Sequence, residues 1–183
     1  MIPLLWQELS VSAAPVPPET EVLLAALRRI YTNGGAELRA FDLSMSALWL
    51  AHAAYDDLDR LGFPDLFLRQ PAVDALLPAP QRVVPPGTES GFSRLGEPLE
   101  DHLTLRLISG GAYVACDLSP EEAEDTVIAF CHALFSDSSG NLTTYLSEQG
   151  WHGWLHDIAW DATLVTVDRT QGRVWVLMLT DMD

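Results

Sequence analysis

Two short segments of the sequence contain the residue types that could do chemistry. In the first, His52 and Asp56 are four residues apart, so in a helix they point the same way, and Asp59 lies one turn further on. This spacing could hold a divalent metal, or it could poise His52 as a general base oriented by a carboxylate. A surface His–Asp pair above a second packing layer accounts for the same spacing without any chemistry.

The second segment covers residues 151–160 and is rich in aromatic and ligating side chains: Trp151, His152, Trp154, His156, Asp157 and Trp160. His152 and His156 would share a face only in a helix, and the glycines at 150 and 153 oppose one. One hypothesis for the two segments is that His52, Asp56, His152 and His156 together bind a metal ion, although no motif links them. The sequence contains no HExxH, Walker A, GxGxxG or GxSxG motif to support an enzyme.

The tryptophans of this second segment have two interpretations. Tryptophan is enriched at the energetic centres of protein interfaces, which makes Trp151 and Trp154 candidate partner-binding residues. The more frequent outcome is that such side chains seal the end of a sheet and belong to the core.

Charge is the most informative bulk property of the chain. Its 183 residues include 26 acids and 10 bases, a formal net charge of −16, and every base is arginine. Residues 1–96 carry 11 acids and 7 arginines, whereas residues 97–183 carry 15 acids and 3 arginines. A surface of this sign repels nucleic acid and anionic membranes and attracts a basic protein. Acidity that only keeps the protein in solution is the simpler explanation.

The acids are densest at the start of a predicted helix over residues 119–135. Ser119 caps this helix, Pro120 occupies its first position and Glu122 completes a capping box. The expected buried stripe is Ala123, Val127, Phe130, Cys131 and Leu134. Acids at a helix start are favourable to the helix dipole, which explains much of the cluster. The same residues are our candidate contacts for a basic partner: Asp117, Glu121, Glu122, Glu124 and Asp125.

Apolar spacing predicts three helices upstream of the acidic half, over residues 19–31, 44–61 and 71–77, and a Pro/Gly-rich connection over 78–98. The expected core stripe of the second helix is Leu43, Ala47, Leu50, Ala54, Leu58 and Leu61. Its opposite face is also apolar, so Met45 and Trp49 could join two copies in a homodimer.

Strand patterns dominate the rest of the chain. Leu103, Leu105 and Leu107 alternate with polar residues and predict a strand, which a Ser-Gly-Gly turn joins to a partner over 112–117. A helix is expected from Asn141 to about Gln149. Strands over 162–168 and 173–179 form a second hairpin at the end of the chain.

Together these elements predict one α+β domain over residues 1–183, with a helical part at 19–77 and a hairpin–helix–hairpin part at 99–183. The two hairpins would form a sheet of about four antiparallel strands, packed against helices on one face. The N-terminal helices could cover the same core or form a separate small layer. Cys116 and Cys131 form no disulfide framework, and no segment is long and apolar enough to span a membrane, so we expect a cytoplasmic location.

For function, we expect a non-enzymatic, cofactor-free protein that binds a basic partner through its acidic C-terminal half. The small, acidic, tryptophan-bearing composition is similar in general character to that of bacterial immunity proteins, which implies an inhibitor or immunity-type role. The alternative is a metal-assisted hydrolase or small-ligand protein built on His52, Asp56 and residues 152–157.

Overall fold

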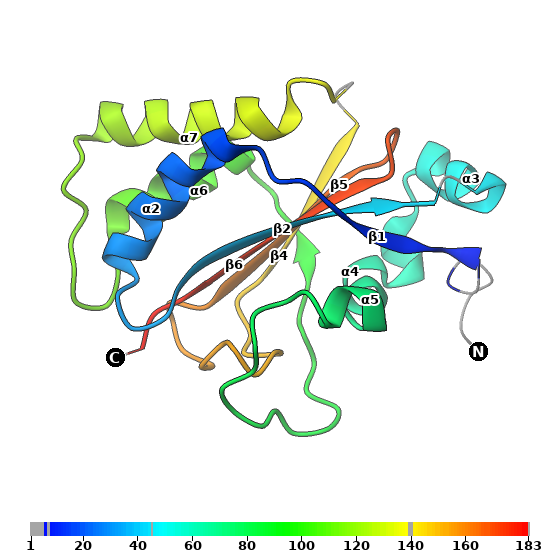
Figure 1. The fold of residues 1–183 in the computed structure, drawn as a ribbon, viewed down its shortest axis with the longest axis horizontal. Helices are drawn as coiled ribbons and strands as arrows, with labels where there is room; N and C mark the ends of the chain where they lie inside the picture. The colour runs from blue at the N-terminus through cyan, green and yellow to red at the C-terminus, as the bar shows by residue number, and fades with distance from the viewer. Residues whose placement is uncertain (1–5, 7, 45, 139–140, 183) are drawn as a thin grey trace.

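A single antiparallel sheet organises the fold of the computed structural model, which describes residues 6, 8–44, 46–138 and 141–182. The sheet has six strands in the order β1-β2-β6-β5-β4-β3 (Figure 1). In that order the strands are Val11–Ala14, Gly35–Leu43, Arg173–Thr180, Ala162–Asp168, Leu142–Ser147 and Ser93–Arg94. The predicted α+β class is confirmed, but the predicted sheet of about four strands in two hairpins is too small.

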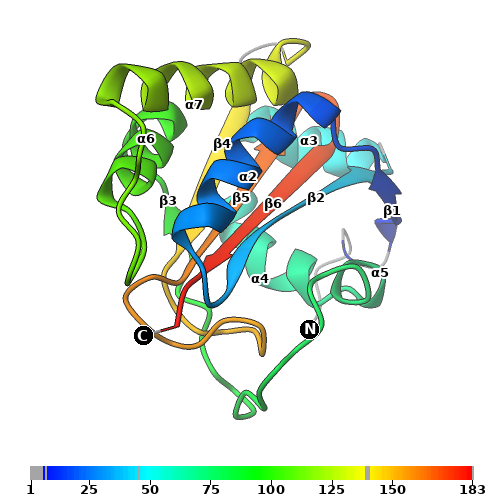
Figure 2. The same ribbon diagram turned by 60° about the vertical axis from the view of Figure 1, so that its left-hand side comes forward.

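Helices cover both faces of this sheet (Figure 2). One face carries α2 (Glu21–Ile30, preceded by the short η1, Pro18–Thr20), α6 (Leu99–Ser109) and α7 (Pro120–Phe135). The other face carries α3 (Ala47–Tyr55), η2 (Leu58–Leu61), α4 (Phe63–Leu68) and α5 (Pro71–Asp74). The sequence left open whether the N-terminal helices share one core with the others or form a separate layer, and the structure divides them: α2 lies beside α6 and α7, whereas α3–α5 form the second layer.

The central strands β5 and β6 explain why two helical layers are needed. All of β5 and residues 174–180 of β6 are buried. Val174 and Val176 point into the cluster beneath α3–α5, whereas Trp175 and Leu177 point into the cluster beneath α2, α6 and α7. Strands buried on both faces have continuous apolar sequences instead of alternating ones, and Val-Trp-Val-Leu-Met-Leu at 174–179 is such a sequence.

The strongest local predictions are confirmed. Ser119 Oγ accepts a hydrogen bond from the Glu122 N–H, and the Glu122 carboxylate accepts one from the Ser119 N–H at 2.8 Å, which completes the capping box of α7. Every residue of the expected α7 stripe is buried. The hairpin β5–β6 pairs in register from Asp168↔Arg173 to Ala162↔Leu179. The first helix and the 78–98 connection also lie where predicted, apart from the two-residue β3.

Two segments adopt the secondary structure opposite to the one predicted. The leucines at 103–107 belong to the helix α6, in which Leu103 and Leu107 are 1% and 0% exposed and Leu105 is 62% exposed. Residues 110–119 form an irregular connection, so the expected first hairpin is absent. Residues 142–147 form the strand β4 between β3 and β5, not a helix capped by Asn141.

The region between residues 34 and 61 also differs from expectation. Gly35 begins β2, a nine-residue strand that was not predicted. The predicted helix over 44–61 is shorter, because Asp56 adopts a left-handed conformation (φ 51°) that ends α3. Leu58 and Leu61 follow in the separate turn η2, where both are buried.

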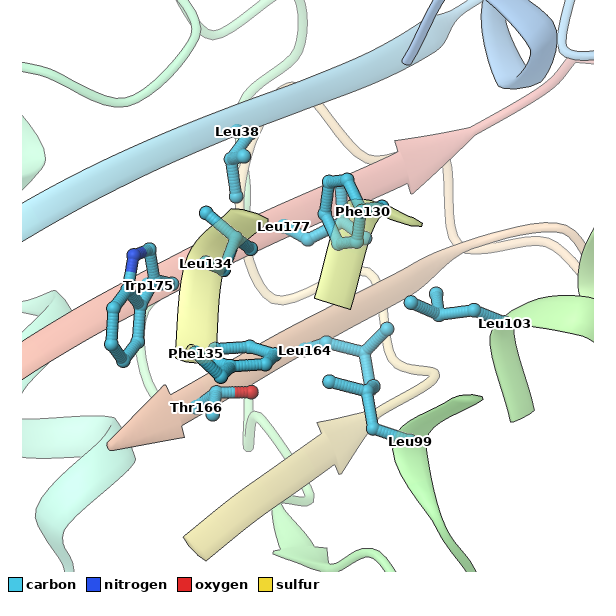
Figure 3. Close-up of a pocket in the computed structure, with 10 residues that line it drawn as sticks. All are labelled: Leu38, Leu99, Leu103, Phe130, Leu134, Phe135, Leu164, Thr166, Trp175 and Leu177. Carbon is cyan, nitrogen blue, oxygen red and sulfur yellow. The ribbon is translucent and has the colours of Figure 1, made fainter. Parts of the chain in front are cut away.

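The interface between α7 and the sheet is closely packed. Figure 3 shows side chains from α6, α7 and the strands converging on one small space: Leu38, Leu99, Leu103, Phe130, Leu134, Phe135, Leu164, Thr166, Trp175 and Leu177. The space measures about 10 Å³, roughly the room for one water molecule. Phe135 and Trp175 meet edge to face across it, with ring centroids 4.9 Å apart. This interface is therefore core and not a ligand cavity.

Paired substitutions in α6 test the helix against the strand that the sequence predicted. Leu107→Ala should lower the free energy of unfolding by about 2–5 kcal/mol, because it removes a fully buried side chain. Leu105→Ala should change it by less than about 0.5 kcal/mol, since that side chain is exposed. Urea unfolding measures both. Similar losses for the two variants would indicate a strand, in which both leucines face the same way.

Candidate functional site

His52 and Asp56 do not form the pair that their spacing predicted. His52 Nδ1 lies 2.9 Å from Asp57 Oδ1. Asp56 is the left-handed residue after the last turn of α3, so it has left the helical path that the prediction assumed. Its carboxylate instead contacts two arginines, Arg94 and Arg169.

Arg94 is the centre of this ion-pair cluster. Its guanidinium donates to both carboxylate oxygens of Asp56, at 3.0 and 2.9 Å, and its Nε lies 2.7 Å from Asp59 Oδ2. The hydrogen bonds from Arg94 lower the pKa of Asp56, and those carboxylates raise the pKa of Arg94. Arg169, from the β5–β6 turn, adds a contact to Asp56 Oδ1 at 3.0 Å and donates to the Ala53 carbonyl. These bonds fasten the end of α3 to β3 and to the β5–β6 turn.

The face of α3 that enters the core is the opposite of the predicted one. Trp49 is 0% exposed and Ala53 is 8% exposed, and both belong to the core. Leu50, placed in the predicted core stripe, is 48% exposed. Trp49 therefore offers no surface to a second copy of the chain, and Met45, the other residue of the expected homodimer face, lies outside the described residues.

The tryptophan segment is an irregular connection between β4 and β5 that closes the end of the sheet. Trp154 is 6% exposed and lies in the core. Trp151 is half-buried, donates its indole N–H to Thr163 Oγ1 at 3.0 Å and packs against Phe92. Trp160 packs against the cluster on the opposite face. The core-sealing interpretation fits these contacts, and Trp154 has almost no area left for a partner.

The two histidines of this segment differ in their contacts. His152 Nδ1 accepts a hydrogen bond from the Trp154 N–H at 3.2 Å, and burial lowers the pKa of His152. His156 Nε2 is buried without a hydrogen-bond partner. Asp157 Oδ1 accepts from the Gly150 N–H at 3.1 Å. Within the part of the chain that the structure describes, no three His, Cys, Asp or Glu side chains are grouped so as to hold a metal ion.

Two residues that the sequence did not single out hold this connection in place. Arg82 Nε donates to the Leu155 carbonyl at 2.5 Å, and its Nη2 donates to the Gly150 carbonyl at 2.7 Å. Asp161, fully buried, accepts from the Asp157 N–H and from Thr180 Oγ1. No sequence motif marks either residue, because their partners are backbone groups and a hydroxyl on a distant strand.

The acidic residues near the start of α7 are exposed, as their proposed role requires. Glu122 serves the capping box, and the hydrogen bond from the Ser119 backbone lowers the pKa of its carboxyl. Asp117 lies 3.4 Å from Arg29 of α2. For Glu121, Glu124 and Asp125, no ion pair is found among the described residues.

Exposed apolar side chains lie on the same stretch of chain as these acids. Leu105 and Ile108 of α6 are 62% and 40% exposed, and Tyr113 and Val114 of the following connection are 66% and 37% exposed. Figures 1 and 2 place the end of α6, the 110–119 connection and the start of α7 together at one end of the molecule, away from α3. We call this region the 105–125 surface.

Comparisons with known proteins found no match to a family model, to a curated protein or to a solved structure. A search of the described helices found none with the length and apolar character to cross a bilayer.

Replacing Asp56 tests the ion-pair cluster. Asp56→Asn keeps a residue type that tolerates the left-handed conformation, so the change isolates the charge. We expect the free energy of unfolding at pH 7 to fall by about 1 kcal/mol, the upper end for partly exposed pairs. The pKa of the Asp56 carboxyl is lower in the folded protein than in the unfolded chain. The ionised carboxylate therefore contributes its full stabilisation at a pH above the pKa of the unfolded chain, and this stabilisation is lost as the pH falls through the pKa of the folded protein.

The difference between wild type and Asp56→Asn in urea unfolding should therefore be constant from about pH 7 to 5 and shrink toward about pH 3. Asp137→Asn, at an exposed aspartate beyond α7, is the matched control and should show little difference at any pH. A difference for Asp56→Asn that does not change with pH would contradict this account.

Proposed function

We propose that this chain is a non-enzymatic binding protein of the inhibitor or immunity type, which meets a basic protein through the 105–125 surface. The observation that carries the proposal is the combination on that surface of exposed apolar side chains and acids outside any described ion pair. Apolar and aromatic side chains supply most of the affinity at protein interfaces, and charges around them supply orientation and association rate.

The charge of the surrounding chain supports a basic partner. Between Arg106 and Arg169 the sequence contains no Lys or Arg, so the loop and all of α7 provide no cation of their own. Arg29, from the neighbouring helix α2, lies 3.4 Å from Asp117. The field of this end of the molecule is negative, which speeds encounter with a positively charged protein.

Two of the ionisable residues considered for an enzyme have other roles in the fold. Asp56 is bound by two arginines, and His152 accepts a backbone N–H. No observation on the described residues favours the metal-assisted hydrolase over the binding protein, so we retain the binding protein alone.

Two sets of variants test the proposal. The wild type, immobilised on beads, is used at 50 mM salt to capture proteins from an extract of its source cells. We expect a basic protein whose capture falls when Glu121, Glu124 and Asp125 are changed to Gln, Gln and Asn, and falls again as the salt is raised. Tyr113→Ala should weaken the same partner by about tenfold, mainly by faster dissociation.

The control changes three exposed acids elsewhere, Glu8, Asp74 and Glu89, to Gln, Asn and Gln, and so makes the same change in net charge. Loss of capture in the control as well would mean that net charge alone attracts the partner. A captured protein that is not basic, or one indifferent to both the acidic variant and Tyr113→Ala, would refute the proposed surface.

A further inference from the structure

A chain of polar contacts lies on the inner side of α6, opposite the exposed Leu105 and Ile108. His102, in the first turn of α6, is only 8% exposed. Its Nδ1 lies 2.7 Å from Glu97 Oε1, and its Nε2 lies 3.1 Å from Nε of Arg106, one turn further along the helix. The guanidinium of Arg106 also pairs with Glu148, which follows β4, and its own side chain is 12% exposed.

The chemistry of arginine fixes the protonation state of His102 in this arrangement. A guanidinium can only donate hydrogen bonds, so the Nε2 atom that faces Arg106 must carry a lone pair. His102 is therefore neutral, its single ring proton is on Nδ1, and that proton is donated to the Glu97 carboxylate. This assignment follows from Arg106, because a guanidinium has no acceptor to offer Nε2.

We propose that His102 is a proton-operated latch: a proton added at Nε2 displaces Arg106 and loosens the C-terminal half of α6. In the neutral state Nε2 accepts from Arg106. In the protonated state two donors, both cationic, would face each other at Nε2, so Arg106 must move away. Glu97 stabilises the imidazolium that remains, because its carboxylate faces Nδ1 in both protonation states.

The charged and titratable groups around this latch come from several elements. Glu97 comes from the connection before α6, Arg106 from α6 itself and Glu148 from the chain after β4. On the α2 side Arg106 also interacts with Tyr31, whose pKa burial raises and which is influenced by Asp181 near the end of the chain. On the α7 side Glu100, in the first turn of α6, interacts with Cys131. Movement of Arg106 would thus release ties to both β4 and α2.

The latch has a consequence for the surface of the same helix. His102 and Arg106 are on the inner side of α6, whereas Leu105 and Ile108 are exposed on its outer side. Protonation of His102 would therefore alter the outer face of α6 as well as its inner contacts. This inference goes beyond the proposed function and does not depend on it, because it concerns the free protein.

Nuclear magnetic resonance of the ¹⁵N-labelled protein from pH 8 to 5 tests the latch directly. At pH 8 the His102 ring should show a protonated Nδ1 and a bare Nε2. As Nε2 gains its proton, the Nε–H signal of Arg106 should shift with the same midpoint. Hydrogen-exchange protection of residues 103–109 should fall by about tenfold with that midpoint, as expected for loss of one charge-assisted hydrogen bond.

Two variants separate the latch from general acid loosening. His102→Gln keeps a side chain that can accept from Arg106 and donate to Glu97 but cannot gain a proton, so protection of residues 103–109 should not change with pH. Glu97→Gln keeps the Arg106 contact and removes the anion, so the midpoint should move to lower pH.

Three results would contradict the latch: an Nδ1 without a proton at pH 8, an Arg106 signal that does not respond to Nε2 protonation, or a midpoint that Glu97→Gln leaves unchanged. The latch is equally wrong if a folded His102→Gln retains the pH-dependent exchange.

Discussion

The fold depends on the burial of β5 and β6 on both faces. These strands present large apolar side chains alternately to two opposite sides, and each side must be removed from water. The helices α2, α6 and α7 cover one side, and α3–α5 cover the other together with Trp6. Because this apolar surface is enclosed in two clusters, most charged residues lie at the perimeter, where several of them connect the layers to one another.

Arginines make most of those perimeter connections. Arg94 and Arg169 fasten α3, Arg82 fastens the tryptophan connection, and Arg106 joins α6 to the end of β4. A planar guanidinium can bind two acceptors at once, so one residue can link two segments far apart in the sequence. With ten bases against 26 acids, the arginines used in this way leave the excess of acids elsewhere, and the 105–125 surface is one place where that excess gathers.

The sequence predicted the elements whose signals are local. The capping box at Ser119 and Glu122, with five apolar residues at helical spacing, specifies α7 completely, and the apolar runs around a Gln-Gly turn specify β5 and β6. The leucines of α6 satisfied two periods at once: Leu103, Leu105 and Leu107 alternate, but Leu99, Leu103 and Leu107 also recur every four residues. Packing against α7 and the sheet selects the second period, since it buries Leu103 and Leu107 and leaves Leu105 in solvent.

The candidate sites were less predictable than the fold because they depend on tertiary contacts. In β2, alternation of Ala36, Leu38 and Ala40 with charged residues was a usable signal, obscured by the glycines before it. No comparable signal places Arg94 beside Asp56 or Arg106 beside Glu148, since loop lengths and sheet order determine those contacts. Spacing indicated that His52 and Asp56 could meet, and one left-handed residue was enough to prevent it. Two residues at helical spacing therefore predict a shared site only when the helix extends through both of them.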